Sequence, residues 1–339
     1  MSDEYKLLNS SKCIAEDKEY AGKLLILKPE ALKVEYRKPF FQYFYAQSGF
    51  GCYADKLGGK IFGKFLVDGE ETHFRRNDLL GVADTEKLPQ WAKTRFENLA
   101  SPKMRIRVFQ IDDGKDADKL KFMSYETVMK RASVDANIYH QVYGGTVNCS
   151  DLEGVFSLCN TTFPAGYYGH SLSVSDVIEI CDGERKGFYY CDVVSFEKID
   201  FDISKVDRSD MLKVLIFECG NEPYAAEIRD ELKAKQNVVG GLIEPVYFAE
   251  KDNVLIYCDE EFLLKSCEPN RKVGDLIIHG TFMVVGNGEN EYGEGIEVSL
   301  TDAQIEKYSE MFRYPLIYMT KEELAEGQAE DPDEGISQT

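Results

Sequence analysis

Two short glycine-containing segments carry the residue types that phosphate binding or nucleophilic catalysis would need. Gly58–Lys64 fits the first seven positions of a phosphate-binding loop, but Phe65 stands where a Ser or Thr hydroxyl should hold Mg²⁺. A β-prone run also follows this segment, where a helix N-terminus should receive the phosphates. We therefore interpret its glycines as turn residues and predict no nucleotide site here.

The second segment, Gly169-His-Ser-Leu-Ser173, is similar to a nucleophile elbow, whose glycines permit a strained turn between a strand and a helix. Ser173 replaces the last of those glycines. Ser173 and Asp176 have the spacing of a capping box, which favours a structural turn instead. An enzyme whose site assembles from distant residues around His170, Ser171 and Asp176 is the first alternative function.

The sequence lacks the spacings of metal sites. The four histidines lie far apart, no Cys-x-x-Cys or His-x-x-x-His pair occurs, and the acidic residues after Asp252 lack the alternation of a calcium loop. The nine cysteines are scattered through apolar runs, as is typical of reduced core residues. We predict no catalytic, cofactor-binding or metal-ligating residues and no cofactor, and we expect a protein that is not an enzyme.

The elements that would position these residues belong to an α+β fold of several domains. The chain has 339 residues, of which 43% are hydrophobic and 12% aromatic, enough for more than one core. Asp-Gly pairs at 68–69 and 182–183, each between β-prone runs, predict hairpins. Apolar residues at helical spacing predict helices over Glu86–Leu99 and Thr301–Phe312. We expect largely antiparallel sheets and short helices.

Polar, charged stretches divide the chain into three small mixed modules. An N-terminal α+β module is expected at 21–112, a second module at 121–201 and an acidic C-terminal α+β module at 211–315. The acidic tail at 321–339 is expected to be flexible. The strand predicted at Arg105–Ile111 would be the last element of the first module.

Three local expectations concern the second and third modules. Gly144 and Gly145 should break the β-prone stretch Ile138–Val147. Ser150 should be the N-cap of a short helix, with Glu153 completing a capping box. Residues 286–295 should form a long hairpin loop.

The net charge of −20 is concentrated toward the C-terminus. Residues 1–120 carry a net +2, residues 121–210 a net −6 and residues 211–339 a net −16. Such a field opposes binding to phosphate backbones and suits a basic protein partner. The second alternative function is a DNA-binding regulator that uses the N-terminal module and the basic strand of Lys103, Arg105 and Arg107.

The chain carries no membrane or secretion signal that the sequence reveals. No apolar stretch reaches the roughly 18–20 residues of a membrane span, and the first residues are acidic rather than apolar. We expect a cytoplasmic bacterial protein without membrane contact.

Two segments resemble known domain families. Residues of about 139–196 resemble the YodL-like domain through Val142–Val147, Asp151–Glu153 and above all Gly169–Ile178. Residues of about 211–313 resemble a domain of unknown function, family 3846, through their first strand and the segment 299–306.

The resemblance implies a biological setting rather than a reaction. Such domains occur in accessory proteins of phages and conjugative elements, including proteins thought to counter host defences. We therefore expect a non-catalytic interaction protein of a bacterial mobile genetic element, which counteracts a host defence or DNA-processing protein through an acidic surface.

Overall fold

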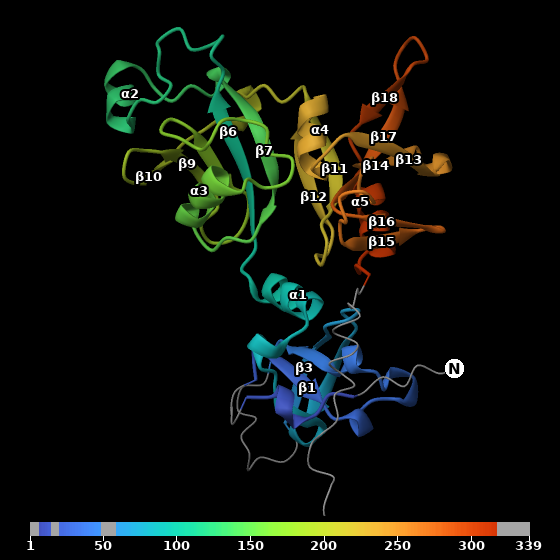
Figure 1. Ribbon diagram of the computed structural model, residues 1–339. Coiled ribbons are helices and arrows are strands. Elements are labelled where there is room, and N and C mark those ends of the chain that lie inside the picture. Colours follow the sequence, from blue (N-terminus) through green and yellow to red (C-terminus); the bar gives the residue numbers. More distant parts are fainter. Residues whose placement is uncertain (1–6, 15–19, 49–58, 317–339) are drawn as a thin grey trace, which may run out of the picture. The chain divides into compact units, whose positions relative to one another are not determined.

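The computed structural model describes residues 7–14, 20–48 and 59–316. The chain divides into two compact units, one of residues 1–100 with 317–339 and one of residues 101–316. Both consist of largely antiparallel sheets with short helices (Figure 1), so the predicted α+β class is confirmed. The tail predicted at 321–339 lies outside the described residues.

The first unit is built on a five-stranded antiparallel sheet in the order β4-β3-β2-β1-β5. Its strands are β1 (Leu24–Leu27), β2 (Tyr43–Ala46), β3 (Lys60–Phe65), β4 (Glu71–Arg75) and β5 (Leu79–Val82). Helix α1 (Gln90–Ala100) packs Trp91, Ala92 and Phe96 on one face of this sheet. The hairpin predicted at residues 68–69 is confirmed, because β3 pairs with β4 across it and Gly69 has a φ of 69°.

The glycines of the segment that is similar to a phosphate-binding loop are not turn residues where the structure describes them. Gly58 lies outside the described residues, and Gly63 lies inside β3. A Cβ atom at Gly63 would lie 2.1 Å from the carbonyl oxygen of Tyr45 on the neighbouring strand. The turn interpretation was therefore wrong for Gly63, which permits the close approach of β2 and β3.

The second unit is built on one eleven-stranded sheet in the order β10-β9-β8-β6-β7-β12-β11-β17-β14-β13, with β18 paired to β17. The strands are β6 (Met104–Ile111), β7 (Tyr139–Val147), β8 (Val177–Ile180), β9 (Gly187–Cys191), β10 (Phe196–Ile199), β11 (Met211–Phe217), β12 (Tyr224–Arg229), β13 (Ile243–Ala249), β14 (Val254–Asp259), β17 (Phe282–Glu289) and β18 (Gly295–Val298). A separate hairpin pairs β15 (Pro269–Val273) with β16 (Leu276–His279). The hairpin predicted at residues 182–183 joins β8 to β9 and is confirmed.

The module boundaries differ from the expected ones. Strand β6 was assigned to the first module, but it lies between β7 and β8 in the sheet of the second unit. The first boundary therefore falls near residue 100 rather than 112. The second and third expected modules share one continuous sheet and one compact unit, because β7 pairs with β12.

Four helices of the second unit cover its sheet. They are α2 (Tyr125–Arg131), α3 (Leu152–Thr161), α4 (Leu232–Val239) and α5 (Asp302–Met311). The predicted N-cap Thr301 of α5 is confirmed, as is the packing of Ile305, Tyr308 and Phe312 into the core. The cap of α3 was predicted wrongly, since Asp151 rather than Ser150 accepts the hydrogen bond from the Gly154 N–H.

The join between the two halves of the second sheet depends on a glycine. Gly144 lies directly opposite Glu227, in the register pair that joins β7 to β12. A Cβ atom at Gly144 would lie 2.9 Å from Oε2 and 3.1 Å from Cβ of Glu227. Contrary to the expectation, the two glycines do not break β7. Gly144 leaves room for the Glu227 side chain of β12, and Gly145 leaves room for the ring of Tyr143 in β7 itself.

We predict that Gly144→Ala destabilises the second unit by about 1–3 kcal/mol, because the added methyl group overpacks the join. Hydrogen exchange of peptides from β7 and β12 measures the change, since the single tryptophan, Trp91, lies in the other unit and does not report on this one. Gly295→Ala is the matched control, because a Cβ atom there meets nothing within 4 Å. Equal exchange rates in both variants would contradict the prediction.

Candidate functional site

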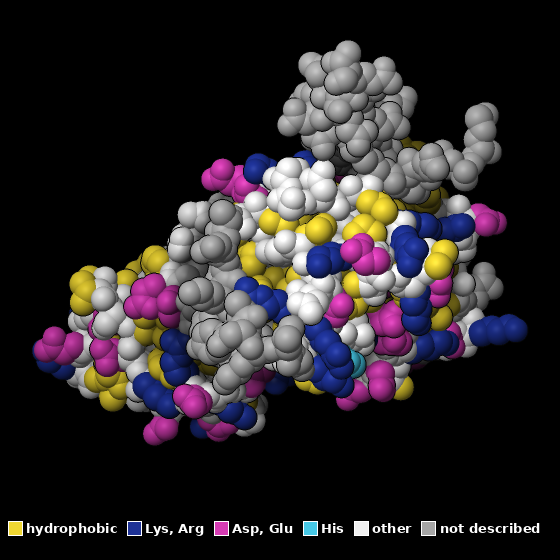
Figure 2. Space-filling view, turned by 90° about the horizontal axis from the view of Figure 1, so that it is seen from below, with side chains coloured by type: hydrophobic (Ala, Val, Ile, Leu, Met, Phe, Trp, Pro, Cys, Tyr) yellow, Lys and Arg dark blue, Asp and Glu magenta, His cyan; other side chains and the backbone are white. Residues whose placement is uncertain are grey.

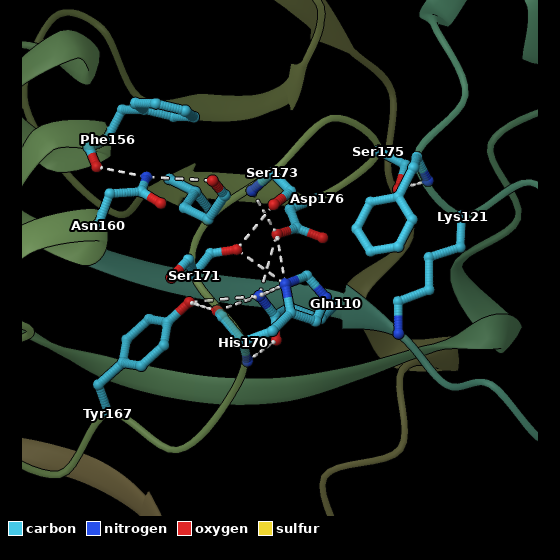
Figure 3. Close-up of polar contacts among 12 residues, drawn as sticks. Gln110, Lys121, Phe156, Asn160, Tyr167, His170, Ser171, Ser173, Ser175 and Asp176 are labelled. Carbon is cyan, nitrogen blue, oxygen red and sulfur yellow. Dashed lines mark hydrogen bonds and ion pairs between the residues drawn. The ribbon is translucent and has the colours of Figure 1, made fainter.

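The segment from Tyr167 to Asp176 is organised around the side chain of Gln110 from β6 (Figure 3). The Gln110 amide nitrogen donates to the His170 carbonyl oxygen at 2.8 Å and to Asp176 Oδ2 at 2.9 Å. The Gln110 amide oxygen accepts from the His170 N–H at 3.0 Å. The buried Gln110 side chain thereby satisfies both the N–H and the C=O group of His170 in an irregular loop.

The structure brings His170, Ser171 and Asp176 into one neighbourhood but does not connect them as a catalytic relay. The nearest atoms of the His170 ring and the Asp176 carboxylate, Nδ1 and Oδ2, are 3.8 Å apart. His170 Nδ1 instead lies 2.8 Å from the Ser171 carbonyl oxygen. Among the described residues, His170 Nε2 is buried without a hydrogen-bond partner, and no hydrogen bond joins it to the Ser171 hydroxyl. A nucleophile activated by a base requires that bond.

The turn expected at Ser173 and Asp176 is present in part. The Ser173 N–H donates to Asp176 Oδ2 at 2.9 Å, which is one half of a capping box. The Asp176 N–H donates to the Ser173 carbonyl oxygen at 3.1 Å rather than to the Ser173 hydroxyl, so the other half is absent and no helix follows. Ser175 closes the turn with a φ of 80°.

Burial sets the protonation of this cluster. Burial raises the pKa of Asp176 to about 7, against the hydrogen bonds from Ser173 and Gln110 that lower it. Burial also lowers the pKa of His170, assisted by the charge of Lys121, while the Ser171 carbonyl raises it. At neutral pH the histidine is therefore uncharged, and the carboxyl group is close to its midpoint.

The basic strand proposed for DNA binding belongs to the second unit, and its charges are engaged. Arg107 donates to Glu227 at 2.8 Å and to Glu179 at 2.9 Å. Arg105 lies 3.3 Å from Asp182, and Lys103 donates to the Asn148 side chain. These contacts engage the three cations that would have to bind the phosphates of DNA.

Glu227 is the centre of a polar network across the join between β7 and β12. It accepts hydrogen bonds from Arg107, from Gln141 at 2.7 Å and from Arg208 at 3.0 Å. Burial works to raise the pKa of Glu227, but the hydrogen bonds from Arg107 and Gln141 and the charges of Arg107 and Arg208 outweigh it and lower the pKa to about 2. The carboxylate is therefore ionised at neutral pH and holds both arginines.

A cleft of about 670 Å³ lies on the other side of this join. One wall is the loop after α3, with Phe163, Pro164 and Tyr167, and the other is the face of α4 that carries Lys233, Gln236 and Asn237. The cleft therefore exists only where the two halves of the second unit meet. We call it the junction cleft. Sequence reasoning missed it, since no local pattern marks a space formed by segments about 70 residues apart.

The hairpin loop expected at 286–295 is shorter, because β17 and β18 extend into it and leave residues 290–294. Figure 1 shows this turn extending past the rest of the sheet. Asn290 orders it: its side-chain oxygen accepts from the N–H groups of Tyr292 and Glu294, both at 2.9 Å. Tyr292 is 79% exposed.

Comparison with known families agrees with the expected order of domains. Residues 105–201 match the YodL-like domain, and residues 212–313 match the family described as Domain of unknown function (DUF3846). The first match begins earlier than the expected residue 139, since it includes β6. No curated protein and no solved structure matches the chain. Within the part of the chain that the structure describes, no helix is long and apolar enough to cross a membrane.

We predict that Asp176→Asn becomes increasingly more stable than the natural protein as pH rises from about 4 to 7. The folded pKa of Asp176 is raised, so the contribution of this carboxyl group to stability is complete below the unfolded value of 3.8 and is lost as pH rises toward 7. Asparagine keeps the oxygen that accepts from Ser173 and Gln110. Hydrogen exchange of β6 and β8 at several pH values measures the difference, and a difference that does not change with pH refutes the prediction. Glu184→Gln, at an exposed turn, is the control.

Glu227→Gln should show the opposite dependence. The folded pKa is lowered, so the contribution of Glu227 is complete above the unfolded value of about 4.5 and is lost as pH falls toward 2. We expect Glu227→Gln to lower the free energy of unfolding by about 1–3 kcal/mol at pH 7, and this difference from the natural protein should shrink below pH 4.5. Hydrogen exchange of β7 and β12 measures it. The exposed Glu306→Gln should change stability by less than about 0.5 kcal/mol. If Glu227→Gln differs from the natural protein as much at pH 3 as at pH 7, the lowered pKa of Glu227 is refuted.

Proposed function

We propose that this protein, whose second unit carries a YodL-like domain followed by a domain of unknown function, is a non-catalytic accessory protein of a bacterial mobile genetic element. It binds a basic host protein of the defence or DNA-processing machinery through the turn between β17 and β18. The mobile-element setting follows from the resemblance of both domains to those of phages and conjugative elements. The surface of the acidic half supports the mode of binding.

Much of the acidity of that half is neutralised locally. Residues 211–316 contain 20 acidic and 10 basic side chains, a net charge of −10. At least nine of those acids lie in ion pairs with Lys or Arg, namely Glu227, Asp230, Glu231, Asp252, Asp259, Glu261, Glu297, Asp302 and Glu310. Figure 2 shows acidic and basic side chains interspersed on the face seen from below in the view of Figure 1. The ion pairs of residues 211–316 give no support to a continuous acidic ridge in imitation of DNA.

The single observation that carries the proposal is the acidic turn between β17 and β18. Glu289, Glu291 and Glu294 are exposed there and form no ion pair within the described residues. Asn290 holds the turn in one conformation, with a further hydrogen bond from its amide to Glu294 at 2.8 Å. An ordered turn that presents Tyr292 among carboxylates without an ion-pair partner in the described residues matches the aromatic anchors and charge complementarity of protein interfaces.

The test compares two triple variants of the full chain that lose the same charge. One is Glu289→Gln, Glu291→Gln and Glu294→Gln at the turn, and the other is Glu244→Gln, Glu268→Gln and Asp275→Asn at exposed positions elsewhere in the same half. Affinity purification from a bacterial host lysate with quantitative mass spectrometry identifies proteins retained by the natural chain. Binding of the recovered protein is then measured with purified components.

We expect the turn variant to weaken Kd by tenfold or more, which corresponds to about 1.4 kcal/mol, and the control triple to change it by less than threefold. Binding of the natural chain should weaken as salt increases. Equal losses in both triples would show that net charge rather than this turn is recognised. Recovery of no partner, or of an acidic one, would refute the proposal.

A further inference from the structure

The loop that forms one wall of the junction cleft packs closely on β12 and α4. Gly166, next to the lining residue Ala165, has a φ of 84°, and a Cβ atom on it would lie 2.5 Å from Cγ2 of Ile228 on β12 and 3.2 Å from Cγ2 of Val238 on α4. Ala165 packs into the apolar core beneath α4. Since the loop after α3 sits directly on β12 and α4, the cleft is preorganised rather than a gap between mobile parts.

The wall contributed by α4 carries a row of side chains that can form hydrogen bonds with an occupant of the cleft. Lys233, Gln236, Asn237 and Gly240 are spaced at i, i+3, i+4 and i+7, so they lie on one face of the helix, and that face lines the cleft. Asn237 and Lys233 are exposed, and Gln236 is half-buried. A side-chain amide offers one acceptor and two donors, which matches the N–H and C=O groups of an extended peptide backbone.

The opposite wall is apolar. Phe163 is 41% exposed although its ring packs 5.3 Å from that of Tyr167. Its backbone has a φ of 55°, because it follows the C-cap of α3, where a left-handed residue commonly ends a helix. Its N–H donates to the Leu158 carbonyl oxygen at 3.0 Å, which fixes the start of the loop. Leu242, 52% exposed, extends the apolar lining at the start of β13.

The charges of the cleft leave one cation uncompensated. Lys265 is held by Asp259 at 2.6 Å and by Glu261 at 3.5 Å. Lys233 forms no ion pair within the residues that the structure describes. An occupant that supplies one carboxylate beside an apolar side chain would complement both Lys233 and Phe163.

We propose that the junction cleft binds a short extended peptide segment of a partner protein, with an apolar side chain against Phe163 and a neighbouring carboxylate on Lys233. Gln236 and Asn237 bind its backbone. A nucleic-acid strand is the less favoured occupant, because the chain carries a net charge of −20 and Glu261 lies on the rim. The cleft and the turn between β17 and β18 share no residue, so this site stands or falls independently of the proposed function.

The test selects ligands from a library of random twelve-residue peptides displayed on phage, with the full-length protein as target. An enriched peptide is synthesised with a fluorescein label, and its Kd is measured by fluorescence anisotropy. Three variants probe the walls: Phe163→Asn, which tolerates the left-handed backbone, Lys233→Glu, and Gln236→Trp, which fills the cleft. Lys272→Glu, at an exposed position on β15, is the matched control for the charge reversal.

We expect enriched peptides in which an apolar residue lies beside Asp or Glu. Each of the three cleft variants should weaken Kd by tenfold or more, whereas Lys272→Glu should leave it within twofold, with hydrogen exchange of α4 and β12 unchanged in all four. The proposal is overturned if no peptide is enriched, or if binding survives Lys233→Glu and Gln236→Trp. A fluorescein-labelled dT12 oligonucleotide that displaces the peptide and loses binding in Lys233→Glu would instead assign the cleft to nucleic acid.

Discussion

The second unit depends on one carboxylate, that of Glu227. It lies over Gly144 at the register pair that joins β7 to β12, and it accepts hydrogen bonds from Arg107, Gln141 and Arg208. Removing one member of such a partly buried network leaves the opposite charge without its partner, which costs more than the pair gains in net stability. The network ties β6, β7 and the segment before β11 to β12 at the register pair of Gly144 and Glu227. It makes one sheet out of two segments that match separate domain families.

Because that join is rigid, features from both families come into fixed relation. The loop after α3 packs on β12 and α4 through Gly166, and the junction cleft opens above this contact. The loop continues into the cluster of His170 and Asp176, where Gln110 holds the backbone on both sides. The hydrogen bonds of this cluster act mainly on the loop backbone. These hydrogen bonds support the loop that forms one wall of the cleft.

The carboxylates of the C-terminal half fall into two groups that composition alone does not separate. Many of its carboxylates hold lysines and arginines of the same unit, including Asp259 on Lys265 and Asp302 on Lys213. Exposed pairs such as Asp302 with Lys213 add little stability, since solvent and salt screen them, whereas Asp259 is buried. The carboxylates at the turn between β17 and β18 form no such pair among the described residues, and they flank an exposed tyrosine. Charge that the fold does not neutralise is available to a partner.

The sequence by itself determined the α+β class, the two Asp-Gly hairpins, the capped helix at Thr301 and the order of the two domains, because these follow from turn chemistry, periodicity and motifs within a few residues. Only the tertiary structure placed β6 in the second unit, joined the expected second and third modules, and showed Gly63 and Gly144 as points of close approach. It alone formed the junction cleft and paired Arg107 with Glu227. These contacts are non-local, since Glu227 lies 19 positions from Arg208 and 120 positions from Arg107, and no local pattern encodes which distant segment a strand or charge will meet.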